Sequence, residues 1–325
     1  MKTSVIIPNY NGIAFLPDCL TTLEANRKDG FDFEIILVDN GSADKSVEYV
    51  KSNHPEVVTV ELKENTGFAA AVNSGIESAL GEYVLLLNND IKVYPDFVKN
   101  LENAIEADDK LFSVNSVMLS MSNNEILDGA GDYYCALGWA YAYGKGKNAQ
   151  KLLSGKKRNI FSACGGASIY RKKILDEIGV FDEEHFAYLE DIDLGYRARI
   201  YGYKSILEPS AVCEHAGSGF SGSRYNEFKI DLSSRNSIYL IHKNMPLLQR
   251  LINLPFLIIG FAVKTAFFAL KGYGKVYVKG LIKGFKLSFS KKGRAKKVPF
   301  RFKNLGNLFV IQLLLWINII RRPFA

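Results

Sequence analysis

The chain has 325 residues, 48% of them hydrophobic, so it can bury a full core and hold more than one region. Its formal net charge of +7 conceals a segregation, because no acidic residue follows Asp231 while the last 94 residues contain 18 lysines and arginines. The first 231 residues therefore hold 23 basic and 34 acidic side chains. This pattern argues against a protein that binds nucleic acid over its whole length, and it indicates an anionic partner for the tail alone.

The cysteines and the first residues of the chain indicate a reducing compartment. Cys19, Cys135, Cys164 and Cys213 are scattered, with no C-x-x-C pair, so we expect reduced thiols in a reducing environment. The chain opens on a strand-like segment at residues 4–7 rather than on the apolar stretch of a secretory signal. We therefore expect no signal peptide.

The first 90 residues alternate apolar strands with helices. The expected strands are residues 4–7, 34–38, 57–62 and 83–87. The expected helices contain Leu16, Leu20 and Leu23 at helical spacing, Val47 and Val50 after a cap at Asp44, and the small-residue segment 68–79. Continuous apolar strands separated by helices are typical of a mostly parallel sheet that is covered on both faces.

The later segments differ in character. Residues 120–160 are rich in Asn, Gly, Lys and Tyr, which predicts a long, less regular functional excursion. Regular structure is expected again from residue 161 to about 210, including a strand over residues 205–212. From about residue 235 the composition becomes basic and apolar.

Polar clusters follow three of the expected strands, at residues 8–11, 39–42 and 88–90. In a parallel sheet these ends lie along one edge, where ligands bind in open α/β folds. Turn chemistry alone favours the same residue types at a single strand end, but three clusters together favour a binding site. Asp90 could hold a divalent cation and, through it, a diphosphate. We therefore expect a phosphorylated small molecule as ligand.

Three carboxylates lie close together at Glu190, Asp191 and Asp193. In a helix, Glu190 and Asp193 share a face with Arg197, while Asp191 points elsewhere, towards small residues such as Gly195. A helix N-terminus favours the ionised form of Asp191. This arrangement suits a general base that faces a substrate, and the alternative is a solvated, acidic helix start.

His215 follows the expected strand 205–212 and precedes a glycine-rich loop. It is one of only four histidines, and its position makes it a candidate metal ligand or phosphate contact. The alternative for a lone histidine is a structural role.

In this order, the motifs resemble those of the inverting family 2 glycosyltransferases, and in particular the bacterial rhamnosyltransferase-like branch. The matching stretches are residues 4–12, 38–42, 65–73, 87–90, 165–167, 179–183 and 190–194, and the surroundings of 235–236 and 243–244 are also similar. The resemblance covers about residues 3–245. It implies a GT-A fold, in which a Rossmann-like, mostly parallel α/β sheet with flanking helices binds the nucleotide.

The resemblance also implies a division of the chain. Residues 1–235 would form the catalytic domain, with a nucleotide-sugar-binding half at 1–115 and an acceptor-binding half at 116–235. Residues 236–325 would form a basic, helical, membrane-associating region.

Donor-binding roles follow from the resemblance. Pro8 and Tyr10 would line the nucleobase pocket, and Asp39 would accept a hydrogen bond from the pyrimidine N3–H, which favours uracil or thymine. Gly67 and Asn73 would lie near the nucleoside.

The metal site departs from the family pattern. Asp90 matches the last acid of the D-x-D motif and would bind Mg²⁺ or Mn²⁺ beside the diphosphate, with His215 as the second protein ligand. Asn88 and Asn89 stand at the first two positions of this motif, where neither is an acid. They would therefore orient the donor or the loop rather than bind the metal. A single carboxylate suffices where phosphate oxygens and water complete the metal shell.

The acceptor side follows in the same way. Asp191 matches the catalytic base, which would take the proton of an acceptor hydroxyl while that oxygen displaces the nucleoside diphosphate with inversion. The residues that would support it or contact the acceptor are Gly166, Ala167, Glu190 and Asp193.

The basic tail contains two apolar segments, residues 254–270, interrupted by Lys264, and residues 308–320, interrupted by Gln312 and Asn318. Both are shorter than the ~20 apolar residues of a membrane span, and a central lysine would cost roughly 2.5–3.5 kcal/mol on insertion. We therefore expect interfacial helices.

Between the apolar segments, lysines recur every three or four residues, and a basic run follows at 291–297. Each would add about 1 kcal/mol of attraction to anionic lipid. These features predict peripheral attachment to the cytoplasmic face of the cell membrane. The alternatives are a solvated helical face, a homo-oligomer interface formed by the C-terminal helices, true spans, or, least favoured, nucleic-acid binding.

Together these features predict an inverting glycosyltransferase of cell-surface polysaccharide biosynthesis. Its expected partners are a nucleotide-sugar donor, a glycan or polyprenyl-diphosphate-linked acceptor, and an anionic membrane surface, with no nucleic acid. The resemblance alone favours dTDP-rhamnose over a UDP-sugar as the donor. One alternative is a sugar-phosphate nucleotidylyltransferase, but residues 8–11 lack the glycine-rich loop of that class. The other is a non-catalytic membrane-bound scaffold.

Overall fold

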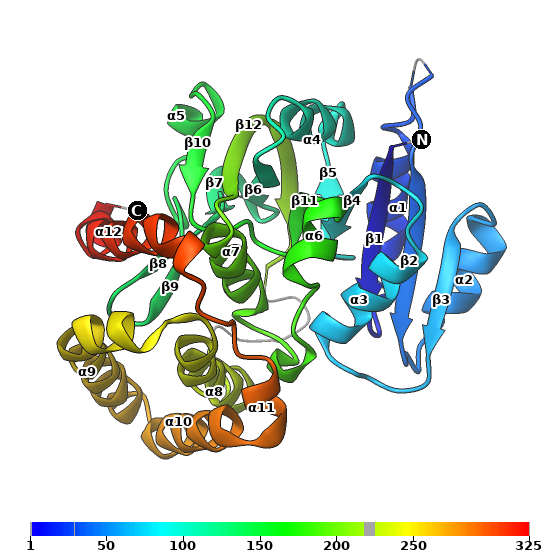
Figure 1. The fold of residues 1–325 in the computed structure, drawn as a ribbon. Coiled ribbons are helices and arrows are strands. Elements are labelled where there is room, and N and C mark those ends of the chain that lie inside the picture. Colours follow the sequence, from blue (N-terminus) through cyan, green and yellow to red (C-terminus); the bar gives the residue numbers. More distant parts are fainter. Residues whose placement is uncertain (1, 29, 218–224, 325) are drawn as a thin grey trace.

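The computed structural model describes residues 2–28, 30–217 and 225–324, and Figure 1 shows its fold. Most of the glycine-rich loop expected after His215 lies outside the described residues.

The first elements follow the predicted order. They are β1 (Thr3–Asn9), α1 (Leu16–Glu24), β2 (Glu34–Asn40), α2 (Ser46–Asn53), β3 (Val58–Leu62), α3 (Phe68–Ser78) and β4 (Tyr83–Leu87). β1 pairs in parallel with β2 and β4, and β2 pairs in parallel with β3. The carboxyl ends of these strands therefore meet at one edge of the sheet, as the sequence predicts.

The sheet continues beyond β4 with strands of mixed direction. The further elements are β5 (Ile91–Val93), α4 (Phe97–Glu106), β6 (Leu111–Ser120), β7 (Asn123–Gly129), β10 (Arg158–Ile160), β11 (Ala167–Arg171) and β12 (Lys204–His215). The strand order is β10-β12-β6-β11-β4-β1-β2-β3, with β5 against β12 and β7 against β6. β11 runs antiparallel to both β4 and β6, whereas β12 runs parallel to β6. The mostly parallel α/β architecture is confirmed.

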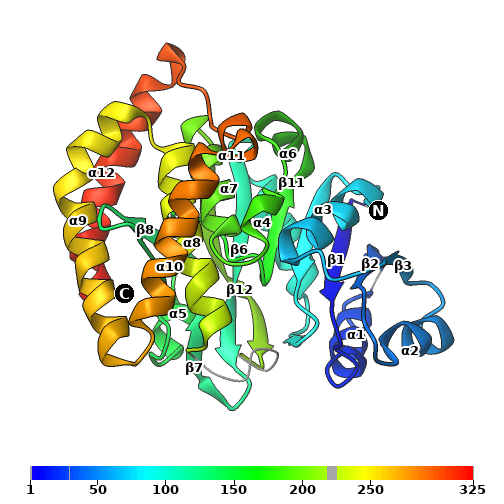
Figure 2. The same cartoon turned by 90° about the horizontal axis from the view of Figure 1, so that it is seen from below.

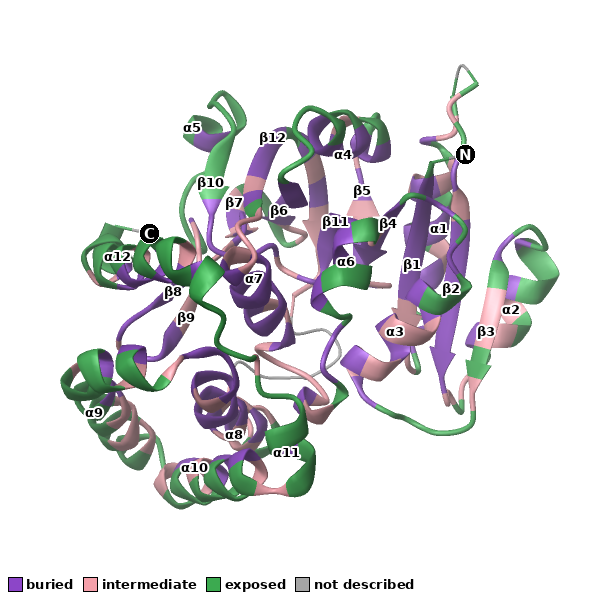
Figure 3. Ribbon diagram, viewed as in Figure 1, coloured by how far each residue is buried: buried purple, intermediate pink, exposed green. Residues whose placement is uncertain are grey.

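Helices cover both faces of this sheet, which is why β4 is buried along its whole length. α1, α2 and α4 contribute to the core on one face, and α3, α6 (Lys172–Ile178) and α7 (Glu190–Ile200) contribute to the core on the other. Figure 3 shows the buried strands between these two layers. Strands that are apolar on both sides are therefore stabilised from both faces.

Residues 120–160 are more regular than predicted. They contain β7, the hairpin of β8 (Asp132–Cys135) and β9 (Trp139–Ala142), the short helix α5 (Gln150–Leu153) and β10. The expectation was wrong because strands of three or four residues are too short to show a hydrophobic period. Glycines with positive φ, such as Gly131 at 88° and Gly138 at 72°, make the turns between them.

The tail is helical and packs on the sheet domain. Its helices are α8 (Glu227–Asn244), α9 (Leu247–Leu270), α10 (Gly274–Phe289), α11 (Lys291–Ala295) and α12 (Leu305–Arg321). α10 lies between α8 and α9 along one flank of the molecule (Figure 2). α10 lies against α8 so closely that a Cβ at Gly280 would overlap the Ser234 side chain. The amides of Asn253 and Gln312 exchange two hydrogen bonds of 2.8 Å and join α9 to α12. Residue 235, the predicted end of the catalytic domain, lies inside α8.

Two tail segments, Leu247–Leu270 and Phe302–Phe324, are long and apolar enough to cross a membrane when judged by length and composition alone. Both helices exceed the apolar segments predicted from the sequence, because amides such as Asn253 and Gln312 are buried between them rather than interrupting them. Their outer faces expose apolar side chains along several turns, including Ile258, Ile259 and Phe309. The prediction that both segments are too short to span a membrane is therefore wrong, whereas their interfacial position stays a prediction.

Candidate active site

A pocket of about 800 Å³ opens at the polar edge of the sheet, between the strand ends and the tail helices. It gathers most of the residues predicted from the sequence. Those that line it are Pro8, Tyr10, Gly67, Asn88, Asn89, Asp90, Gly166, Glu190, Asp191 and His215. The structure thus brings the end of β4 to the same cavity as the start of α7 and the end of β12, both of which lie more than a hundred residues later in the sequence.

A chain of hydrogen bonds fixes the nucleotide side of the pocket. Asn89 donates to Asn9 Oδ1 at 2.7 Å, and Asn9 donates in turn to Asp39 Oδ1 at 2.9 Å. The other oxygen of Asp39 accepts from the Ser42 backbone N–H at 2.9 Å. Asp39 is 4% exposed and stands behind the pocket lining rather than in it. In this structure, Asp39 therefore organises Asn9 and Asn89.

Gly12 is required by this hydrogen-bond chain. A Cβ at Gly12 would overlap both the Asn89 amide nitrogen and the Asn9 amide oxygen. We expect Gly12→Ala to separate the two amides, to cost about 1–3 kcal/mol of unfolding free energy, and to weaken nucleotide binding. Denaturant unfolding and nucleotide titration measure the two effects. Gly306→Ala, where a Cβ meets nothing within 4 Å, is the matched control, and equal behaviour of the two variants would contradict the prediction.

The candidate metal ligands Asp90 and His215 lie side by side. Antiparallel pairing of β12 with β5 puts His215 opposite Ile91, so its Nε2 lies 3.3 Å from Asp90 Oδ1. On the other ring nitrogen, Nδ1 lies 2.7 Å from Asp128 Oδ2, and Lys145 holds the second Asp128 oxygen at 2.7 Å. A carboxylate on the far nitrogen is the usual way in which a metal-binding histidine is oriented.

Opposite charges on His215, Asp128, Asp90 and Lys145 stabilise one another. Burial alone would lower the pKa of His215, but the bonds to Asp128 and Asp90 outweigh it and raise the pKa to about 9. Burial would raise the pKa of Asp128, but His215 and Lys145 lower it to about 2. His215 is therefore an imidazolium between two carboxylates when no cation is bound. Once it loses the proton on Nε2, one imidazole and one carboxylate face the same pocket, and this ligand pair fits a divalent cation in chemistry.

Asp191 occupies the first turn of α7, where the Ile192 N–H donates to its Oδ1 at 2.7 Å. Asp132 of β8 and the Cys164 thiol lie within 4.8 Å of its carboxylate. Burial and the charge of Asp191 raise the pKa of Asp132 well above its usual value, so Asp132 carries the proton of this pair. Burial also raises the pKa of Asp191, which brings a carboxylate closer to the basicity that general-base catalysis needs.

The loop before Asp191 has an unusual backbone. Three of its residues have positive φ values, namely Phe186 (60°), Tyr188 (70°) and Leu189 (68°). A residue other than glycine in this conformation costs roughly 1–3 kcal/mol of stability. The Asn236 amide on α8 lies within 2.9 Å of the carbonyl oxygens of 185, 187 and 188 and donates to them. Arg235 donates to the carbonyls of 184 and 185. α8 thereby fixes the approach to the candidate base.

Asp193 does not face the pocket. It is fully buried, and its carboxylate binds Arg197 at 3.0 Å and Lys243 at 2.8 Å. Lys243 also binds Asp182 at 2.6 Å. Burial would raise the pKa of Asp193, but the two cations hold it well below its usual range. The predicted i, i+4 contact with Arg197 is present, and it belongs to a structural network that joins α7 to α8.

Two other predicted residues lie outside the pocket lining. Asn73 on α3 donates to the Phe181 carbonyl at 2.9 Å and accepts from the Phe181 N–H at 3.1 Å. It therefore ties α3 to the chain before the 186–189 loop. Ala167 is buried in β11, next to the pocket-lining Gly166.

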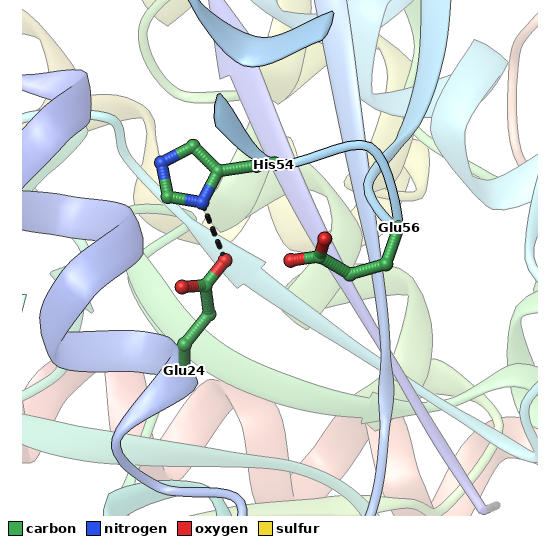
Figure 4. Close-up of side chains that lie close together, drawn as sticks. All are labelled: Glu24, His54 and Glu56. Atoms are coloured by element: carbon green, nitrogen blue, oxygen red, sulfur yellow. Dashed lines mark hydrogen bonds and ion pairs between the residues drawn. The ribbon is translucent and has the colours of Figure 1, made fainter. Parts of the chain in front are cut away.

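Sequence reasoning missed the acids that residues 120–160 deliver to the pocket. Asp128 lies one residue before the end of β7 and Asp132 begins β8, and both line the cavity together with Lys145. Two acids separated by small residues, in the run D-G-A-G-D, were the available signal. A further acid and histidine group, Glu24, His54 and Glu56, lies outside the pocket lining (Figure 4). There His54 Nδ1 contacts Glu24 at 2.6 Å and fastens the end of α2 to the end of α1.

Comparisons with known proteins agree with this geometry. Residues 4–179, more than half of the chain, match the family model described as glycosyl transferase family 2. The uncharacterised glycosyltransferase YwdF of Bacillus subtilis (strain 168) is 27% identical over 243 residues, which span 74% of this chain and 82% of that protein. The N-acetylglucosaminyl-diphospho-decaprenol L-rhamnosyltransferase of Mycobacterium tuberculosis is 25% identical over 206 residues, spanning 56% of this chain and 66% of that protein.

Solved structures show the same fold. The mannosyltransferase PcManGT of Pyrobaculum calidifontis, in complex with GDP-Man and Mn²⁺, matches with a TM-score of 0.55 and 18% identity, over 97% of this chain and 86% of that one. TarS (residues 1–349) of Staphylococcus aureus, in complex with UDP-GlcNAc, matches with a TM-score of 0.58 and 16% identity, over 97% and 90%. The chain therefore belongs to glycosyl transferase family 2, has the GT-A fold, and transfers a sugar from a nucleotide-sugar donor.

Proposed function

We propose that this protein transfers a hexose, with inversion, from a dTDP- or UDP-linked donor to a hydroxyl group of a lipid-linked glycan. One observation carries the proposal. A single pocket is lined both by the Asp90–His215 pair, which suits a cation and a diphosphate, and by Asp191, which suits a general base. Donor and acceptor can therefore meet in one cavity.

The donor would bind along the strand ends. Pro8 and Tyr10 would contact the base, and Asp39 would act through Asn9 and Asn89, which it holds in place. Asp90 and His215 would hold Mg²⁺ or Mn²⁺. When bound, such a cation would neutralise the charge that develops on the leaving diphosphate.

Asp191 would perform the proton transfer. Its carboxylate removes the proton from an acceptor hydroxyl as that oxygen forms the new bond to the anomeric carbon of the donor sugar. The bond from that carbon to the diphosphate breaks on the opposite face, so one displacement inverts the centre. Protonated Asp132 would donate to Asp191 and keep the carboxylate oriented towards the acceptor.

The donor sugar is proposed on similarity. dTDP-rhamnose is preferred, because a similar enzyme of Mycobacterium tuberculosis is named as an L-rhamnosyltransferase that acts on a diphospho-decaprenol. A UDP-hexose is the second candidate, because TarS carries UDP-GlcNAc on the same fold. A rhamnosyl donor would also give the chain a role in cell-surface polysaccharide biosynthesis.

We propose peripheral attachment to the inner face of the membrane. α9 and α12 expose apolar side chains, and α10 adds exposed lysines such as Lys275 and Lys279 beside them. Apolar and cationic groups together suit an interface with anionic lipid.

The test is a thermal-shift panel of nucleotide sugars, each with and without Mn²⁺. At 100 times its Kd, a true donor adds about 2.7 kcal/mol of stability, which corresponds to a rise in Tm of roughly 4 °C for a chain of 325 residues. We expect the largest rise with dTDP-rhamnose and Mn²⁺. His215→Ala should remove the increase in Tm that Mn²⁺ adds, whereas His242→Ala, on α8 and outside the pocket lining, should retain it. A panel in which no nucleotide sugar raises the Tm would overturn the proposal.

A further inference from the structure

Lys264 is a cation of α9 that turns away from the exposed face of that helix and lines the active-site pocket. Its Nζ lies 5.7 Å from the centre of the Trp139 ring. Within the described part of the chain, the ammonium has no ion pair or hydrogen bond. Burial lowers the pKa of Lys264 to about 8, so the group is still mostly charged at neutral pH.

The surroundings fix this ammonium in position. Trp139 Nε1 donates to the Gly260 carbonyl of α9 at 3.1 Å. A Cβ at Gly260 would overlap the Leu137 carbonyl, so α9 lies directly on the β8–β9 hairpin. Arg322 lies over the same indole at 4.4 Å from its centre and supplies a second positive charge nearby. A partly dehydrated cation beside another cation is unfavourable unless an anion joins it.

The pocket suggests where such an anion comes from. The donor diphosphate has its own site, at Asp90 and His215. The carboxylate of Asp191, the candidate base, also lines the pocket and would repel an anion beside it. A neutral glycan would leave Lys264 without a counter-ion. The remaining source is an anionic group carried by the acceptor itself.

The position of Lys264 on α9 indicates the kind of acceptor. On the far side of the same helix, between one and two turns earlier, Ile258 and Ile259 are exposed, on the apolar face that we propose for the membrane interface. Inside the pocket, the rings of Phe268 and Tyr277 stack at 5.0 Å next to Lys264 in the lining. A cation and an apolar wall under an interfacial helix suit a phosphate attached to a lipid chain.

We propose that Lys264 binds the phosphate group that joins the acceptor sugar to its lipid. This inference rests on the proposed function, because it names the acceptor class of the same site. The phosphate lies at Lys264, the lipid leaves the pocket along Phe268 and Tyr277 beneath α9, and the sugar extends towards Asp191.

Binding can be tested without any transfer reaction. The chain has two tryptophans, so Trp316→Phe leaves Trp139, beside Lys264, as the sole indole reporter. Titrating this protein with a short alkyl diphosphate should change Trp139 fluorescence and saturate. Lys264→Gln should weaken binding about 10- to 100-fold, as expected for loss of a charge-assisted hydrogen bond. Lys264→Arg should retain most of the affinity for the alkyl diphosphate, because it keeps the positive charge.

The controls separate this inference from the proposed function. Lys279→Gln removes an exposed lysine from α10 and should leave alkyl diphosphate binding unchanged. A neutral alkyl glycoside should bind wild type and Lys264→Gln alike. If wild type and Lys264→Gln bound the alkyl diphosphate with equal affinity, the inference would be wrong. It would also be wrong if Lys264→Gln raised the KM of the nucleotide sugar instead of weakening alkyl diphosphate binding. Absence of transfer by wild type, with these binding results intact, would count against the proposed function alone.

Discussion

Asp191→Asn should lower the transfer rate by about 10²–10⁴-fold while nucleotide-sugar binding stays within twofold of wild type. Asparagine keeps an Oδ1 that can accept the Ile192 N–H, so the first turn of α7 should persist. It cannot accept the proton of the attacking hydroxyl. The effect should therefore fall on kcat, with little change in the KM of the donor, which steady-state kinetics and a donor titration would measure.

A matched substitution controls for the loss of one carboxylate. Asp176→Asn, at an exposed position on α6, should leave both kinetic constants unchanged. If Asp191→Asn transferred sugar within tenfold of the wild-type rate, with donor binding intact, Asp191 would not be the base.

Lys243→Met should destabilise the protein by about 3–5 kcal/mol, because it leaves Asp182 buried without a cation. Lys243 lies 2.6 Å from Asp182 and 2.8 Å from Asp193, and all three side chains are at most 3% exposed. Asp193 keeps Arg197 at 3.0 Å, so the damage centres on Asp182. Denaturant unfolding measures the loss. Lys292→Met, which breaks an exposed pair with Glu184, should cost at most about 1 kcal/mol.

Two further measurements test the cause of this loss. Adding Asp182→Asn to Lys243→Met should restore part of the stability, since a neutral amide replaces the unpaired charge. Burial would raise the pKa of Asp182, but Lys243 outweighs it and lowers the pKa. The stability that ionised Asp182 contributes is thus fully present above the pKa of an unfolded aspartate, about 3.9, and is lost as the pH falls below that value. The gap between wild type and Lys243→Met should therefore narrow at pH 3, and a constant gap would refute this cause.

Local patterns predicted the nucleotide half of the fold well. The strands at β1, β2, β3 and β4 are continuous apolar runs that end in polar residues, and both features are visible in a few residues of sequence. Parallel order then places their ends together by geometry alone. The polar strand end singles out Asp90, whereas Asp191 is singled out by a cluster of carboxylates at the start of a predicted helix.

Other parts of the site depend on pairings between distant segments. Asp128 reaches His215 only because β7 and β12 both pair with β6, and no short motif encodes that arrangement. Asp193 and Asp191 are both carboxylates in the first turn of α7. Asp193 points into the core and binds Lys243, whereas Asp191 faces the pocket. Lys264 interrupts an apolar segment in the sequence, whereas in the structure it points inward to the pocket.

The contacts of α8 bear on how the tail can be removed. A chain cut after residue 235 would lose Asn236, which holds the positive-φ turn ahead of Asp191, and Lys243, which neutralises Asp182. Such a cut would therefore remove more than an attachment to lipid. Shortened forms made for solubility should keep α8 whole and end after it, because this helix fixes both the loop before Asp191 and the buried carboxylate of Asp182.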